Sequence, residues 1–204
     1  MSLEKKLKYI LLFFLLLPLN MLLAQSSFDV QVKTFQQKRI AINQTAMIVL
    51  GSWAAGNILV GTYGKFNYKG EAKYFHQFNA FWNIVNLGIA AFGYINAVNT
   101  DPAAMSNTEI IKDFNSLQNF LLLNAGLDVA YMSVGLYLRE RAKNSSNVSR
   151  LRGYGNSLLL QGGFLLLFDV SLFFIHQNNA TVYLYPHLES LMAGGVGLGI
   201  NFKF

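Results

Sequence analysis

Cysteine is missing from this 204-residue sequence, and charged residues and proline are scarce. Without cysteine the chain can form no disulfide, no thiolate metal site and no cysteine nucleophile. Charged residues make up 13% of the chain, whereas hydrophobic residues make up 53%. A soluble domain of this size would struggle to bury so much apolar surface, so the composition predicts a membrane protein.

Motifs of enzymes and metal sites are also absent. The sequence has no G-x-S-x-G nucleophile motif and no phosphate-binding loop. Its three histidines, His76, His176 and His187, fall on different segments and lack a metal-ligand spacing such as HExxH. We therefore predict no catalytic residue, no cofactor, no metal site and no enzymatic activity.

The first 24 residues have the pattern of a secretory signal peptide. A basic front with three lysines precedes an apolar core at 10–19, and Ala24 supplies a small residue before the cleavage point. Cleavage there leaves a mature chain that starts outside the cytoplasm. The alternative is an uncleaved anchor, which adds a fifth span.

Four apolar stretches follow, and each is long enough to cross a bilayer. A helix of about 18 to 22 residues covers about 27 to 33 Å, close to the hydrocarbon thickness of about 30 Å. Helices are the expected form, because every backbone amide in lipid must be bonded internally. The predicted spans are 46–63, 80–98, 117–138 and 156–175.

The connections between these spans alternate in charge. Connections 64–79 and 139–155 together carry eight basic and two acidic residues, whereas connection 99–116 has three acidic residues and one lysine. Basic loops are retained in the cytoplasm, so the pattern predicts a multi-pass protein of the bacterial inner membrane with both mature termini in the periplasm. The net charge of +6 then requires no nucleic acid. The expected partners are membrane lipid and either another protein or further copies of the chain.

Two features of the segments outside the spans have a structural interpretation. Phe28, Val32 and Phe35 recur at helical spacing in segment 25–45, which predicts an amphipathic helix on the membrane surface or an extension of the first span. Asp101-Pro102 predicts a turn or a helix start, and Ser106 followed by Glu109 matches a capping box. The third helix is thus expected to begin outside the membrane.

The tail, residues 177–204, has a different pattern. Residues alternate between apolar and other types at 181–185 and 196–204, which predicts a small extracytoplasmic β-hairpin that turns near Gly194 and Gly195. A terminal aromatic strand is also typical of outer-membrane barrels, which makes the outer membrane the alternative location, although one strand cannot close a barrel. The predicted fold is an all-α membrane protein: signal peptide 1–24, amphipathic lead-in 25–45, four-helix transmembrane bundle 46–176 and strand hairpin 177–204.

Polar side chains recur at helical spacing within the predicted spans. Asn79, Asn83 and Asn86 form one stripe on the second span, and carboxyl groups occur at Asp128 on the third and Asp169 on the fourth. Unpaired polar groups are costly in lipid, so these faces are expected to meet inside the bundle. The predicted intramembrane network contains Asn57, Asn83, Asn86, Asn124, Asp128, Tyr131, Gln161 and Asp169.

This network has two interpretations. It can fix the register of the helices, which favours a structural or interaction component of a bacterial cell envelope complex. Alternatively, Asp128 and Asp169 can bind a cation or relay a proton, as carboxylates near the midplane of transporters do, which favours a small transporter or channel subunit. The small-residue pairs Gly51 with Ala55 and Gly126 with Ala130 predict close helix packing.

Three stretches of the chain, 74–83, 124–131 and 153–169, resemble an uncharacterised family of small membrane proteins from Bacteroidota. The resemblance covers most of the mature chain. It implies a bacterial origin and a helical membrane protein that carries a signal peptide. It implies no activity, ligand or site residue.

Overall fold

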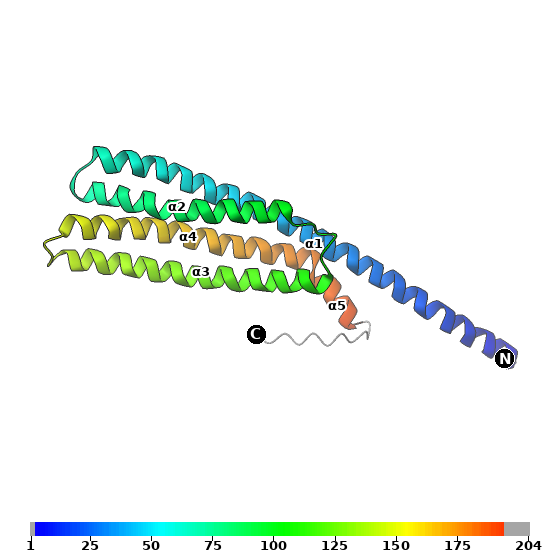
Figure 1. The fold of residues 1–204 in the computed structure, drawn as a ribbon. Helices are drawn as coiled ribbons and strands as arrows, with labels where there is room; N and C mark the ends of the chain where they lie inside the picture. The colour runs from blue at the N-terminus through cyan, green and yellow to red at the C-terminus, as the bar shows by residue number, and fades with distance from the viewer. Residues whose placement is uncertain (1–2, 194–204) are drawn as a thin grey trace.

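The structure, a computed structural model, describes the backbone of residues 3–193 and the side chains of residues 28–189. Within this part of the chain every regular element is a helix. Four long helices run side by side and a short fifth helix turns away from them at one end (Figure 1). They are α1 (Leu3–Asn67), α2 (Gly70–Asn99), α3 (Asn107–Ala142), α4 (Val148–Tyr183) and α5 (Tyr185–Ala193).

The four long helices alternate in direction and lie in the spatial order α1, α2, α4, α3 (Figure 1). The pairs α1–α2 and α3–α4 each form a hairpin, and α2 and α4 join the two hairpins. The α1–α2 and α3–α4 connections lie at one end of the bundle, and the α2–α3 connection and α5 lie at the other (Figure 1). This arrangement agrees with the predicted order of connections in a four-helix bundle.

The α1–α2 connection is much shorter than the predicted loop 64–79, because the helices continue past the ends of the predicted spans. Tyr68 and Lys69 alone separate α1 from α2. Gly70 then begins α2 with φ of 59°, a left-handed conformation that glycine adopts without a Cβ clash. A two-residue reversal is therefore possible at this position.

The exterior of the bundle is apolar, and its interior contains polar as well as apolar side chains. Leu59, Phe92 and Leu167 each expose more than two thirds of their surface, whereas the side chains of Asn83 and Gln161 are fully buried. All four long helices are long and apolar enough to cross a membrane. Their candidate segments contain 30 to 40 residues, which corresponds to about 45 to 60 Å of helix and exceeds a hydrocarbon layer of about 30 Å. In a membrane of that thickness, the ends of helices this long would project beyond the lipid core.

The lead-in 25–45 is part of α1, which continues without a break into the first span. Its apolar face packs against the bundle rather than lying on a membrane surface. Val32 and Phe35 are fully buried in a cluster with Ile110 and Phe114 of α3 and Ala180 of α4. The rings of Phe35 and Phe114 meet edge to face at 5.3 Å. The amphipathic pattern of this segment thus reflects contact with α3 and α4.

The capping box at the start of α3 is confirmed. The Ser106 hydroxyl accepts the Glu109 backbone N–H, and the Glu109 carboxylate accepts the Ser106 backbone N–H at 2.7 Å. The turn at Asp101 is also confirmed, since its carboxylate accepts the backbone N–H of Ala103.

The predicted C-terminal β-hairpin is not supported. Residues 181–185, predicted as its first strand, belong to the end of α4 and the start of α5. The alternating pattern predicted a strand, but the neighbouring apolar residues Ala180 and Leu184 are four positions apart, as on one face of a helix. Both are buried in the cluster around Phe35. The second predicted strand, 196–204, lies outside the described residues.

Glycine allows the helices to approach closely, but at positions other than the predicted pair Gly126 and Ala130. A Cβ on Gly153 would lie 2.5 Å from the Glu71 carbonyl oxygen of α2, and a Cβ on Gly135 would lie 2.8 Å from the Gly155 carbonyl oxygen of α4. A Cβ on Gly126 would meet nothing within 4 Å. The α2–α4 and α3–α4 contacts thus bring backbone against backbone.

Candidate functional site

Five polar side chains from α1, α2 and α4 form a group that we call the closed cluster: Trp53, Asn57, Asn79, Asn83 and Gln161. The Trp53 indole N–H donates to Gln161 Oε1 at 3.1 Å, and the Gln161 amide donates to Asn79 Oδ1. Asn79 in turn donates to Asn57 Oδ1 at 2.8 Å. The Asn57 amide donates back to the Trp53 carbonyl at 2.8 Å, which completes a ring of hydrogen bonds.

Asn83 extends this ring along α2. Its amide donates to the backbone carbonyl of Asn79 at 2.8 Å, and its own oxygen accepts from Asn86 at 3.4 Å. Because the ring crosses three helices, it fixes their register, and its members satisfy one another inside the bundle. Stacking of Trp53 on Phe164 at 3.9 Å adds an aromatic contact between α1 and α4.

A groove of about 1190 Å³, which we call the interhelical groove, lies beside the closed cluster. Its sides come from α2 and α3, and residues of α1 and α4 complete the lining. The groove stays open because α2 packs on α1 and α4, and α3 packs mainly on α4. Its polar lining residues are Arg39, Asn43, Trp82, Asn86, Asn96, Thr100, Asp113, Ser116, Asn124, Asp128, Tyr131 and Asp169.

Asp128 of α3 and Asp169 of α4 meet in this groove. Asp128 is 3% exposed and Asp169 is 8% exposed, and the two carboxyl groups lie close enough to influence each other electrostatically. Within the described residues, Asp128 Oδ2 accepts no hydrogen bond from an N–H or O–H group. Two ionised carboxylates repel at close range, so the pair is stable when it shares a proton or when a cation lies between its oxygens.

Neutral polar side chains line the same groove as the pair. Asn86 is buried and lies where the closed cluster meets the groove, since it both lines the groove and bonds to Asn83. Asn124 lines the groove, and no hydrogen bond of its side chain is found among the described residues. Tyr131 meets the Trp82 ring edge to face at 4.9 Å, and both line the groove.

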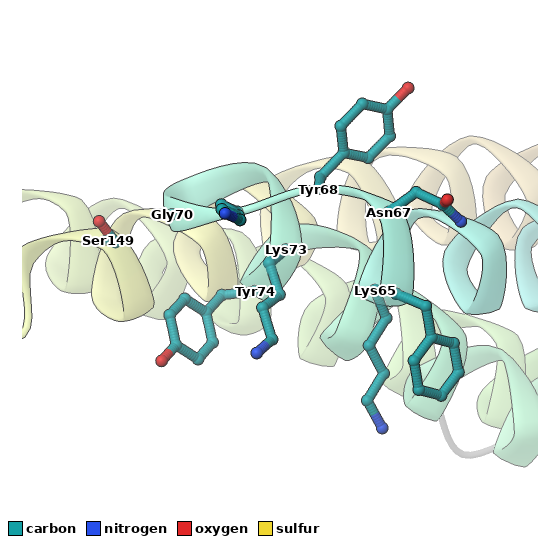
Figure 2. Close-up of a pocket in the computed structure, with 9 residues that line it drawn as sticks. Lys65, Asn67, Tyr68, Gly70, Lys73, Tyr74 and Ser149 are labelled. Atoms are coloured by element: carbon teal, nitrogen blue, oxygen red, sulfur yellow. The ribbon is translucent and has the colours of Figure 1, made fainter.

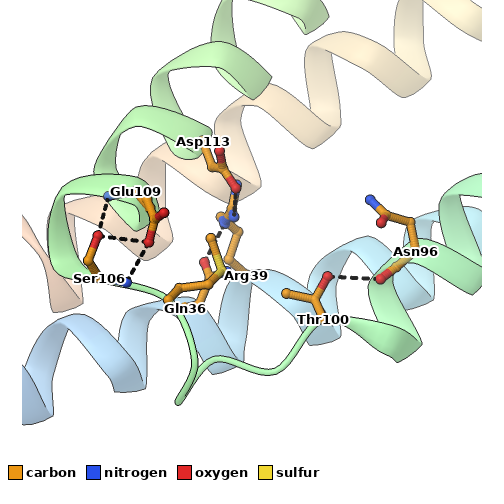
Figure 3. Close-up of polar contacts among 8 residues, drawn as sticks. Gln36, Arg39, Asn96, Thr100, Ser106, Glu109 and Asp113 are labelled. Carbon is orange, nitrogen blue, oxygen red and sulfur yellow. Dashed lines mark hydrogen bonds and ion pairs between the residues drawn. The ribbon is translucent and has the colours of Figure 1, made fainter.

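The end of the groove near the α2–α3 connection carries a second charged group. Arg39 of α1 reaches Asp113 of α3 at 3.7 Å, and its Nε donates to Gln36 Oε1 at 2.7 Å (Figure 3). Arg39 is buried, whereas the Asp113 side chain is 54% exposed. The ion pair therefore joins the lead-in to α3 at this end of the groove, which we call its mouth.

Hydrogen bonds from α1 hold the α2–α3 connection in place at the same end of the groove. Lys33 of α1 donates from its ammonium group to the carbonyl oxygens of Pro102, at 2.7 Å, and of Met105. Close by, the Thr100 hydroxyl bonds to the Asn96 carbonyl at the end of α2 (Figure 3). These contacts fix the position of the mouth relative to α1.

His176 of α4 belongs to the interior of the bundle. Its side chain is fully buried, and its Nε2 lies 2.9 Å from Asn43 Oδ1 of α1. Within the described residues, no three His, Cys, Asp or Glu side chains come close enough together to hold a metal ion.

The eight residues of the predicted network divide between the two regions. Asn57, Asn83 and Gln161 belong to the closed cluster, and Asn86, Asn124, Asp128, Tyr131 and Asp169 line the groove. The prediction missed Arg39, which was assigned to the amphipathic lead-in 25–45. Its position four residues before Asn43 places it on the same stripe of α1, and that spacing was the available signal.

These features define the class of the protein: a helical bundle with four helices that can cross a membrane, an apolar exterior and an interhelical groove lined by both polar and apolar side chains. A family model described as "Family of unknown function (DUF6992)" matches residues 49–170, and the chain belongs to this family. The matched region includes all eight residues of the predicted network. No curated protein and no solved structure matches the chain.

Proposed function

We propose that this protein handles a small cation, a proton or a monovalent metal ion, at Asp128 and Asp169, as a small transporter or channel subunit. The observation that carries the proposal is the position of this carboxyl pair in an open groove, where one buried carboxylate oxygen has no hydrogen-bond donor among the residues that the structure describes. Buried charge inside a membrane protein is costly without a partner, and such carboxylates often mark ion pathways.

The chemistry of the lining supports a cation. Carboxyl oxygens from Asp128 and Asp169, with amide oxygens from Asn86 and Asn124, are hard ligands. The groove provides a route to them from its mouth near Arg39 and Asp113. We assign no catalytic role to any residue.

For the location, we propose a multi-pass protein of the bacterial inner membrane with mature termini in the periplasm. The basic α1–α2 and α3–α4 ends support this orientation, since Lys and Arg are retained in the cytoplasm. The mouth of the groove then faces the periplasm. Removal of residues 1–24 as a signal peptide fits the fold, because α1 extends past the bundle at its N-terminal end (Figure 1).

Flux measurements on the full chain in liposomes test the function. The wild type, the Asp128→Asn/Asp169→Asn double variant and the control Glu109→Gln are compared under an imposed proton gradient and, separately, an imposed sodium gradient. Glu109 is a suitable control because it is an exposed acid at the start of α3. Gel filtration in detergent confirms that each protein is folded and monodisperse.

We expect the wild type and Glu109→Gln to dissipate at least one gradient and the double variant to behave like empty liposomes. The asparagine side chains preserve shape but cannot hold the charge of a bound cation. Equal flux through a well-folded double variant, or no flux through the wild type under either gradient, contradicts the proposal.

The second candidate is a structural or interaction component of a cell envelope complex. It is favoured by the exposed apolar walls of the groove, where Phe81 and Phe92 of α2 and Phe120 of α3 face outward. A helix of a protein partner, or of a second copy of the chain, fits such a surface in a membrane. A wild type without flux that co-purifies in mild detergent with a stoichiometric partner supports this candidate over the first.

A further inference from the structure

A second hollow, of about 700 Å³, lies at the opposite end of the bundle, around the α1–α2 turn. We call it the basic hollow, because Lys65, Lys69 and Lys73 line it. Figure 2 shows the side chains of Lys65, Lys73 and Tyr74 on the same side of the turn. Ser149, near the start of α4, completes the lining from the neighbouring hairpin.

Among the residues whose side chains the structure describes, no carboxylate forms an ion pair with any of the three lysines. The ion pairs among the described residues are Arg39–Asp113 and Lys143–Glu140, and neither involves the hollow. Glu71, the acidic residue at this end of α2, accepts a hydrogen bond from the Asn156 amide of α4 at 2.6 Å. The basic hollow therefore carries an excess of positive charge.

Aromatic side chains place the hollow at the depth of the lipid headgroups. Tyr63, Phe66 and Tyr68 are all exposed around the turn, and rings of this kind gather at the boundary between the hydrocarbon and the headgroups. No charged residue occurs from Arg39 to Lys65, so the apolar stretch of α1 ends at the hollow. A ligand bound at this depth would contact both lysine ammonium groups and aromatic rings.

We propose that the basic hollow binds the headgroup phosphate of an anionic phospholipid. Lysine ammonium groups near a membrane surface attract anionic lipids, and the neighbouring Tyr74 and Ser149 hydroxyls can donate hydrogen bonds to phosphate oxygens. The inference rests on membrane insertion of the helices and not on cation handling by Asp128 and Asp169.

Native mass spectrometry of the full chain, released from detergent that contains defined lipids, tests the proposal. Retention of phosphatidylglycerol is compared with retention of phosphatidylcholine for three proteins: the wild type, the triple variant Lys65→Gln/Lys69→Gln/Lys73→Gln, and the triple variant with arginine at the same positions. Lys143→Gln is the matched control, since Lys143 lies at the same end of the bundle but pairs with Glu140 at 2.6 Å.

We expect the wild type, the arginine variant and Lys143→Gln to retain phosphatidylglycerol in preference to phosphatidylcholine. The glutamine variant should bind phosphatidylglycerol about a hundredfold more weakly, from a factor of about five for each lysine. Equal retention of both lipids by the wild type, or unchanged retention by a folded glutamine variant, overturns the proposal. Inorganic phosphate is added in a separate arm, and displacement of the lipid at millimolar phosphate assigns the hollow to a soluble anion instead.

Discussion

The closed cluster and the interhelical groove contain the same kinds of residue but satisfy them differently. In the closed cluster, the amides of Asn57, Asn79 and Gln161 bond to one another and to Trp53. In the groove, Asn124 has no such bond within the described chain, and a carboxyl oxygen of Asp128 has no donor. The polar residues inside this helical bundle therefore fall into two groups, and their hydrogen-bond partners distinguish the groups better than their burial does.

Replacing Gln161 with leucine should give the largest effect on stability. The substitution leaves the Trp53 indole N–H and Asn79 Oδ1 without partners in the interior. Leaving buried polar groups unpaired costs about 1 to 3 kcal/mol each, so we expect a loss of about 3 kcal/mol in the free energy of unfolding. Reversible unfolding in mixed detergent micelles measures it.

Asn124→Leu is the matched substitution in the groove. Asn124 lines the groove and no described group depends on it for a hydrogen bond. Its removal should therefore change the free energy of unfolding by less than about 0.5 kcal/mol. If Gln161→Leu and Asn124→Leu lowered the free energy of unfolding equally, the closed cluster and the groove would not differ in how their polar groups are satisfied.

Gly153→Ala should have a smaller but clear effect. The new Cβ would lie 2.5 Å from the Glu71 carbonyl oxygen and 2.7 Å from the Phe75 backbone nitrogen, so α2 and α4 must separate. Overpacking of this kind costs about 1 to 3 kcal/mol, and we expect about 2. The separation also strains the closed cluster, which joins the same two helices.

Gly126→Ala provides the control for this substitution. Open space surrounds the new Cβ, and alanine favours a helix over glycine by about 0.5 to 1 kcal/mol. The two alanine substitutions should therefore change the unfolding midpoint in opposite directions. A midpoint that falls equally in both variants argues against close α2–α4 packing at Gly153.

Much of the fold follows from the sequence because apolar runs long enough to cross a membrane are compatible with few structures other than helices. The four spans, their order and the capping box at Ser106 were predicted from apolar runs and local spacing. The error at 181–185 arose because a short segment with period-two alternation can also place apolar residues on one face of a helix. Contact between Ala180, Leu184 and the Phe35 cluster then decides in favour of the helix.

The division of the polar network was harder to predict. Helical spacing identified Asn83, Asp128 and Gln161 as inward-facing, and all three are buried. Spacing alone does not show which helices are neighbours, and the order α1, α2, α4, α3 leaves α2 and α3 on either side of a groove. Whether an inward-facing amide finds a partner depends on that order.

Water access distinguishes the two regions most directly, and the absence of native cysteine makes it measurable with single introduced thiols. Asn124→Cys probes the groove, Asn83→Cys the closed cluster, and Leu167→Cys the exposed apolar surface of α4. Each full-length variant is placed in liposomes and treated with a charged methanethiosulfonate reagent on both sides of the membrane.

A thiol must ionise in water to react with this reagent, so we expect Asn124→Cys to react at least about tenfold faster than both other variants. Such a result supports an open, hydrated groove that leads to Asp128 and Asp169. Reaction at Asn124→Cys as slow as at Asn83→Cys would contradict it, because the groove would then be closed to water and ions.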